Sequence, residues 1–246
     1  MFSLTDLPEL IFSMMAVLIA LSVHEFAHAY AAYKLGDNTA RYSGRLSLNP
    51  LKHIDIAGAV CMLLFRFGWA KPVPINPRNF EKPKRDFAIT AIAGPLANIF
   101  TAFISTLLFL IFYKILPFSI NTPSQAIVYN TCLFLQIFST LNVGLGVFNL
   151  LPIPPFDGSR ILNVILPEKL YFGIMRYERQ IYWGVIAWLL IGPYVYSTLV
   201  ALPFIANNEV LSIIVRIFDL SGLISDAISA IYGGMIWLWQ LIPILK

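Results

Sequence analysis

Residues 7–33, with the sequence LPELIFSMMAVLIALSVHEFAHAYAAY, determine the fold class of this chain. The run is longer than the roughly 20 apolar residues that a helix needs to cross a bilayer, and it carries HEFAH near its carboxyl end. Ionisable side chains within a membrane span are costly unless they are paired or functional. The segment therefore predicts a first transmembrane helix that carries a polar site.

Later apolar segments extend this interpretation to the whole chain. They cover residues 87–116, 126–151, 181–205 and 211–245. The last contains three charged residues and fits either a tilted span or an interfacial helix followed by a span. The composition agrees, because 58% of the 246 residues are hydrophobic and only 12% are charged, against about 25% charged residues in soluble proteins. The prediction is an all-α polytopic membrane protein with about four to six transmembrane helices.

We expect residues 1–246 to form a single membrane-embedded domain, with accessory helices over residues 207–246. Residues 36–86, between the first two spans, differ in composition and are rich in Gly, Pro and Asn. Within them, residues 41–48 and 73–75 are β-prone, whereas the apolar residues 54–65 are too few for a straight span. Irregular backbone at membrane depth must be covered by protein or line a water-filled cavity. The sequence thus predicts a small membrane-associated β-prone or re-entrant insert on the cytoplasmic side.

The distribution of positive charge predicts the topology. Ten of the 17 Lys and Arg residues lie between Lys34 and Arg85, and four more lie between Arg160 and Arg179. Basic loops beside apolar spans are typically cytoplasmic, whereas residues 117–125 contain no Lys or Arg and are expected outside. This pattern is typical of a multi-pass protein, expected in the cell membrane of a prokaryote, and does not favour nucleic acid as a partner.

The three ionisable residues of HEFAH form an H-E-x-x-H motif. The spacing of His24 and His28 places two imidazoles on one helix face, close enough to hold one tetrahedral Zn²⁺. Glu25 lies about 100° around the helix from His24 and can act as general base on a zinc-activated water. The alternative is a hydrogen-bonded His–Glu cluster that only stabilises a helix bundle. The cost of three such groups inside a span favours the metal.

A catalytic zinc ion normally has three protein ligands, so two imidazoles leave one position to fill. Asp157 is the better candidate, in the sequence NLLPIPPFDG at residues 149–158. The prolines there break the helix and can aim a carboxylate inward. The alternative role for Asp157 is to cap a helix over residues 159–166. The charge topology places Asp157 and the HEFAH motif at the same, cytoplasmic, side.

HEFAH, AGPLAN at residues 93–98 and NLLPIPPFDG together resemble the site-2 protease family, in its minimal form without a PDZ or CBS domain. The resemblance covers nearly the whole chain and implies an intramembrane zinc metalloprotease. It implies zinc bound by His24, His28 and Asp157, with Glu25 as the catalytic glutamate. The implied reaction is hydrolysis of peptide bonds in membrane-spanning proteins or peptides near the cytoplasmic face, within the lipid bilayer. Phe156 departs from the family, which often has Leu before the aspartate.

Two further polar residues are candidates for the catalytic set. Asn149 could assist the oxyanion or bind the substrate backbone, or make only an interhelical hydrogen bond. His53 could assist the oxyanion or hydrogen-bond a metal ligand, although a loop histidine is more often simply hydrogen-bonded. Gly94 and Asn98 of AGPLAN are expected to serve helix packing. The β-prone residues 41–80 could pair with an extended substrate strand.

Other classes of protein remain as alternatives at this point. A metal-ion transporter could use intramembrane His, Glu and Asp to line its path, and a membrane scaffold could hold a buried metal site. Transporters often contain inverted repeats, and this sequence shows no internal repeat. A homo-oligomer is compatible with the sequence, which does not identify a substrate.

Overall fold

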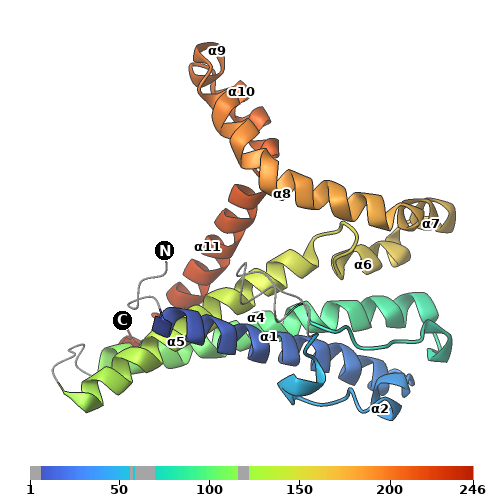
Figure 1. The fold of residues 1–246 in the computed structure, drawn as a ribbon, viewed down its shortest axis with the longest axis horizontal. Helices are drawn as coiled ribbons and strands as arrows, with labels where there is room; N and C mark the ends of the chain where they lie inside the picture. Colours follow the sequence, from blue (N-terminus) through green and yellow to red (C-terminus); the bar gives the residue numbers. More distant parts are fainter. Residues whose placement is uncertain (1–6, 56–57, 59–69, 116–121, 246) are drawn as a thin grey trace.

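The computed structural model describes residues 7–55, 58, 70–115 and 122–245, and these residues are predominantly α-helical (Figure 1). Among these described residues, five helices are long and apolar enough to cross a membrane, a number within the expected range. They are α1 (Leu7–Lys34), α4 (Pro83–Ile115), α5 (Pro123–Leu150), α8 (Glu178–Val200) and α11 (Leu220–Trp239). The chain is an integral membrane protein.

Helices α1, α4 and α5 form the bundle that carries the site, and α4 packs against both of the others (Figure 1). Small residues allow the close approach of α4 and α5. An added methyl group on Gly146 of α5 would lie 2.7 Å from Ile99 Cδ1 and 3.1 Å from the Pro95 carbonyl oxygen. Ala102 and Val143 are buried at the same interface. Close packing of small residues is the usual basis of helix association in membranes.

Short helices α6 (Gly158–Ile165) and α7 (Glu168–Arg176) connect α5 to α8. Two ion pairs join this connection to its neighbours. Lys84 Nζ lies 2.5 Å from Glu168 Oε1, and Arg160 Nη2 lies 2.8 Å from Glu178 Oε1. The first pair links α4 to α7 and the second links α6 to α8.

The strand content expected for residues 36–86 is not confirmed. This insert contains α2 (Thr39–Tyr42), η2 (Pro50–Lys52) and η3 (Pro77–Asn79), and its described residues form one isolated bridge, Ile54 to Ala70, but no strand. Residues 41–48 start in a helical turn and reverse at Gly44, whose φ is +67°. Residues 73–75 contain Pro74, which cannot donate to a ladder. Most of residues 54–65, expected to be re-entrant, lie outside the described residues.

The C-terminal region contains short helices before the long helix α11. Helices α9 (Pro203–Ala206) and α10 (Glu209–Val215) project away from the bundle, and η4 (Arg216–Phe218) returns the chain to α8 (Figure 1). Trp188 Nε1 donates to the Ile217 carbonyl at 3.1 Å. Trp239 Nε1 donates to the Phe103 carbonyl at 3.0 Å and so joins the end of α11 to α4.

The contact between α8 and η4 predicts the effect of an alanine at Gly192. An added methyl group there would lie 2.0 Å from the Phe218 carbonyl oxygen, whereas one at Gly184 of the same helix meets nothing within 4 Å. We expect Gly192→Ala to destabilise the protein by about 1–3 kcal/mol and Gly184→Ala to cause no loss. Thermal unfolding of the detergent-solubilised variants measures the difference. Equal melting temperatures would contradict this packing.

Candidate metal centre

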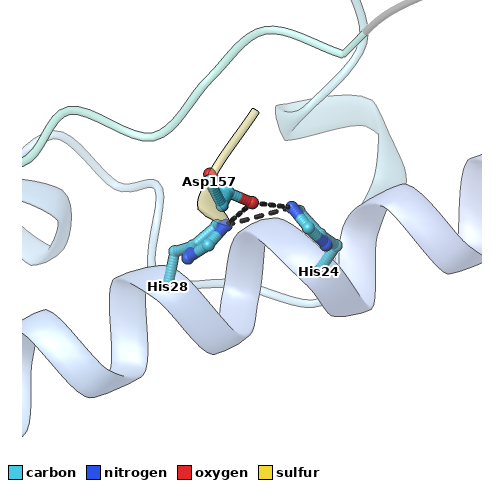
Figure 2. A group of neighbouring side chains, drawn as sticks. All are labelled: His24, His28 and Asp157. Atoms are coloured by element: carbon cyan, nitrogen blue, oxygen red, sulfur yellow. Dashed lines mark hydrogen bonds and ion pairs between the residues drawn. The ribbon is translucent and has the colours of Figure 1, made fainter. Parts of the chain in front are cut away.

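Three side chains from two distant parts of the chain meet beside the carboxyl-terminal half of α1 (Figure 2). His24 and His28 project from the same side of α1 toward Asp157, which precedes α6. Asp157 Oδ2 lies 3.1 Å from Nε2 of each histidine, and the two Nε2 atoms are 3.0 Å apart. Ligand atoms about 2.0–2.1 Å from a tetrahedral zinc ion lie about 3.3–3.4 Å apart. The triangle therefore has nearly the dimensions of one face of a zinc site.

Hydrogen bonds at Nδ1 of each histidine determine which of its ring nitrogens carries the proton. His24 Nδ1 lies 2.6 Å from Asn98 Oδ1, and His28 Nδ1 lies 2.7 Å from the Thr90 carbonyl oxygen. Both partners are acceptors, so each Nδ1 carries the proton. In a neutral ring this leaves Nε2 as a lone pair. Two lone pairs and a carboxylate oxygen of Asp157 then face one another, an arrangement that a divalent cation stabilises.

The orientation of Asn98 follows from its other hydrogen bonds. Its Nδ2 donates to the Ala20 carbonyl at 3.1 Å and to Asn142 Oδ1 at 2.8 Å, which leaves Oδ1 to face His24. Asn98 and Asn142 are both fully buried. Thus α1, α4 and α5 are joined at one polar point, and the ring orientation of His24 is fixed from outside the ligand set.

Gly94 of α4 lies directly against the two imidazoles. An added methyl group on Gly94 would lie 2.4 Å from His28 Nε2 and 2.8 Å from His24 Cε1. Such distances exclude any side chain at this position while the rings keep their places. The absence of a side chain at Gly94 lets α4 cover the imidazoles.

Asp157 enters the site because the chain turns sharply after α5. Residues 151–157 form turns and bends between Leu150 and α6, and Gly158 sits so close to the end of α5 that an added methyl group would be 2.3 Å from the Leu150 carbonyl oxygen. Asp157 occupies the N-cap position of α6 but makes no side-chain cap hydrogen bond. The capping alternative is therefore wrong.

Glu25 shares a cavity of about 320 Å³ with these three residues. Its Oε2 accepts a hydrogen bond of 2.8 Å from the Val73 backbone N–H, so the carboxylate is held by a segment of the insert. The cavity is also lined by Pro72, Ile75, Phe87, Ala91, Asn149 and Arg160. A carboxylate, a candidate metal site and room for a peptide thus coincide at one end of α1.

The two further candidates have different surroundings. Asn149 lines the cavity, and its Nδ2 donates to the Leu145 carbonyl of its own helix at 3.0 Å. His53 is 2% exposed, is not among the cavity-lining residues, and has Nε2 2.7 Å from the Ser47 carbonyl oxygen. The structure therefore brings Asn149 to the candidate site and does not bring His53 there.

Some residues at the site have functions that the sequence did not indicate. Gly94 and Asn98, assigned above to helix packing, contact the histidines directly. The cost of an amide within a span was the available signal for Asn98. Arg160 lines the cavity with its charge paired to Glu178. The sequence could have indicated Arg160 through its position three residues after Asp157, on the first turn of a helix.

The fold and the site define an integral membrane zinc metalloprotease, and comparison with known proteins identifies its family. The sequence model of peptidase family M50 matches residues 12–191. The chain belongs to peptidase family M50, the site-2 protease family.

The chain is similar in sequence to several proteins that are named zinc metalloproteases. The chain is 39% identical over 168 residues to "Putative zinc metalloprotease YwhC" of Bacillus subtilis, covering 68% of this chain and 73% of the relative. It is 28% identical over 225 residues to "Putative zinc metalloprotease Rip2" of Mycolicibacterium smegmatis, covering 89% and 76%. A zinc metalloprotease of Methanocaldococcus jannaschii is 28% identical over 151 residues, covering 61% and 33%. No solved structure matches.

The position of Gly94 predicts a loss of metal on substitution. We expect Gly94→Ala to displace the imidazoles and to lower the zinc content of the purified protein well below that of the wild type. Gly233→Ala is the control, because an added methyl group there meets nothing within 4 Å. Elemental analysis after dialysis measures both variants. Wild-type zinc content in Gly94→Ala would show that the histidines do not need this close approach.

Proposed function

We propose that this protease hydrolyses peptide bonds of membrane-spanning substrates near the cytoplasmic face, with zinc held by His24, His28 and Asp157 and with Glu25 as general base. The observation that carries the proposal is the convergence of these four side chains on one cavity at the end of a membrane-spanning helix. A nucleophilic water and a peptide carbonyl can both reach such a cavity.

The roles of the residues follow from their positions and chemistry. Zinc at this site supplies Lewis acidity, which polarises a carbonyl group and makes water easier to deprotonate. Glu25 lies next to His24 in sequence, lines the same cavity and is absent from the ligand triangle. Its carboxylate accepts a proton from the attacking water and returns it to the leaving amine. Because Val73 occupies only Oε2, the other carboxylate oxygen remains for this transfer.

Asn149 is the proposed partner of the developing oxyanion or of the substrate backbone. It lines the cavity near the end of α5, eight residues before Asp157, so α5 and the turn after it supply both groups. Rotation of its amide away from the Leu145 carbonyl would allow Nδ2 to donate into the cavity. His53 has no part in the proposed chemistry, because it is buried outside the cavity lining.

Substrate is proposed to bind in an extended form beside residues 72–76, which we call the strap. Peptide bonds in a helix are protected by their own hydrogen bonds, so a membrane-spanning substrate must unwind before cleavage. The strap has little regular structure, lines the cavity through Pro72, Val73 and Ile75, and reaches Glu25 through the Val73 N–H. Its backbone offers main-chain groups to an extended peptide, although it does not belong to a sheet.

The proposed orientation places the site toward the cytoplasm in a prokaryotic cell membrane. Lys34 ends α1, and Lys84 and Arg85 lie in the first turn of α4, at the same end of the bundle as the candidate metal centre. Positive residues beside the spans favour a cytoplasmic location for this end. The membrane setting of the protease implies membrane-embedded substrates and a lipid environment.

Glu25→Gln tests the proposed general base. The amide keeps the size of the side chain but cannot accept the proton, so we expect cleavage of a membrane-spanning substrate to fall by about 100- to 10,000-fold with the zinc content unchanged. Glu9→Gln on the exposed first turn of the same helix is the control. Full proteolysis by Glu25→Gln would remove Glu25 as the base. Zinc flux through liposomes without any cleavage by the wild type would favour a transporter.

A further inference from the structure

Asp37 is a buried carboxylate outside the candidate metal centre, and it is connected to that centre through the strap. We propose that Asp37 is a positioning residue for proteolysis: by anchoring one end of the strap it holds the Val73 N–H against Glu25. This inference rests on the proposed role of Glu25 as general base. The evidence is a chain of hydrogen bonds that runs from the end of α1 to the strap and back to α1.

The Asp37 carboxylate is buried and held by several hydrogen bonds. The residue is 0% exposed, and the described residues place no Lys or Arg within ion-pair distance. Its carboxylate accepts hydrogen bonds from the Asn76 N–H at 2.7 Å, Asn79 Nδ2 at 2.7 Å and the Thr39 N–H at 3.0 Å, and from the Thr39 hydroxyl. A buried carboxylate is tolerated only with such full hydrogen bonding. Burial raises the pKa of Asp37, but these donors outweigh it and lower the pKa below its usual value.

Local backbone geometry explains why α1 can present this carboxylate. Gly36 has φ of +103°, a left-handed conformation that glycine adopts readily, and it turns the chain sharply just after the last turn of α1. An added methyl group on Gly36 would lie 3.3 Å from the Asn79 carbonyl oxygen, so η3 packs closely against this turn. Asp37 thus lies between the end of α1 and residues 76–79.

The other end of the strap is held separately. The Arg45 guanidinium donates to the Lys71 and Pro72 carbonyls, and the Lys71 N–H donates to the His53 carbonyl at 2.8 Å. The strap is therefore fixed before Val73 by Arg45 and His53 and after Val73 by Asp37. Three residues span at most about 10–11 Å, so fixing Asn76 narrows the positions open to Val73.

Glu25 and the two histidines are held in place by different parts of the chain. The Val73 N–H holds one oxygen of Glu25, whereas the rings of His24 and His28 are held by α4. Loss of the Asp37 anchor should release the strap and Glu25 but leave the metal ligands in place. A variant at Asp37 should therefore lose turnover while keeping zinc, which a general loss of folding would not do.

The test compares Asp37→Asn and Asp37→Ala with Asn79→Ala, which covers the case in which loss of the carboxylate prevents folding. Asn79→Ala removes one of the four hydrogen bonds to Asp37, together with the bonds of Asn79 to Thr39 Oγ1 and Asn76 Nδ2. Asp86→Asn is the control for loss of a buried carboxylate. Asp86 is 1% exposed, accepts from the Lys82 N–H at the start of α4 and pairs with Arg85, and it is not bonded to the strap. Each purified full-length variant is assayed for zinc content, for kcat and KM on a membrane-spanning substrate, and for amide hydrogen exchange of the strap.

Hydrogen exchange reports on the anchor without any substrate. Pro72 and Pro74 have no amide hydrogen, so exchange in the strap comes from Val73, Ile75 and Asn76, of which Val73 and Asn76 donate to the two carboxylates. We expect faster exchange there in the Asp37 variants, a smaller change in Asn79→Ala, and none in Asp86→Asn. We expect kcat to fall by on the order of 10- to 100-fold in the Asp37 variants at unchanged zinc content.

Two results would overturn the inference. Wild-type exchange rates in a folded Asp37 or Asn79 variant would show that Asp37 does not anchor the strap. Faster strap exchange with unchanged kcat would show that the anchor does not position Glu25. If the wild type itself cleaves no membrane-spanning substrate, the proposed function fails, while the exchange measurements still decide whether Asp37 anchors the strap.

Discussion

The approach of His24, His28 and Asp157 to within 3.0–3.1 Å of one another is the constraint on which the rest of the structure depends. Lone pairs and a carboxylate oxygen repel one another at such distances, and the low dielectric of a membrane-embedded site strengthens that repulsion. A divalent cation bound between these groups attracts all three of them and so offsets their mutual repulsion. The packing of the helix bundle must therefore hold these three side chains close together and orient them for a metal.

Two separate parts of the fold meet the requirement. Helix α4 fits against the imidazoles at Gly94 and orients His24 through Asn98, so metal geometry is set within the bundle. The strap, held by Arg45 and proposed to be anchored by Asp37, donates the Val73 N–H to Glu25. Under the proposed function, metal binding and proton transfer are thus supported by different elements, which allows a change in one to leave the other intact.

The sequence predicts the parts of this arrangement that depend on local pattern. Hydrophobic length predicts the spans, and the spacing of HEFAH with the prolines before Asp157 predicts which side chains meet. The sequence does not predict how α4 is rotated about its axis, which decides that Asn98 meets His24. β-propensity also fails at the strap, because Pro74 and hydrogen bonds to distant carboxylates determine its backbone.

The proposed function depends on Asp157 completing a metal site with the two histidines of α1. The most direct test is the zinc content of the purified wild type, His24→Ala and Asp157→Ala, measured after dialysis against a weak chelator. We expect bound zinc in the wild type and a large loss in both variants, since each removes one of three protein ligands. Unchanged zinc stoichiometry in Asp157→Ala would show that Asp157 is not a ligand and place the third ligand elsewhere.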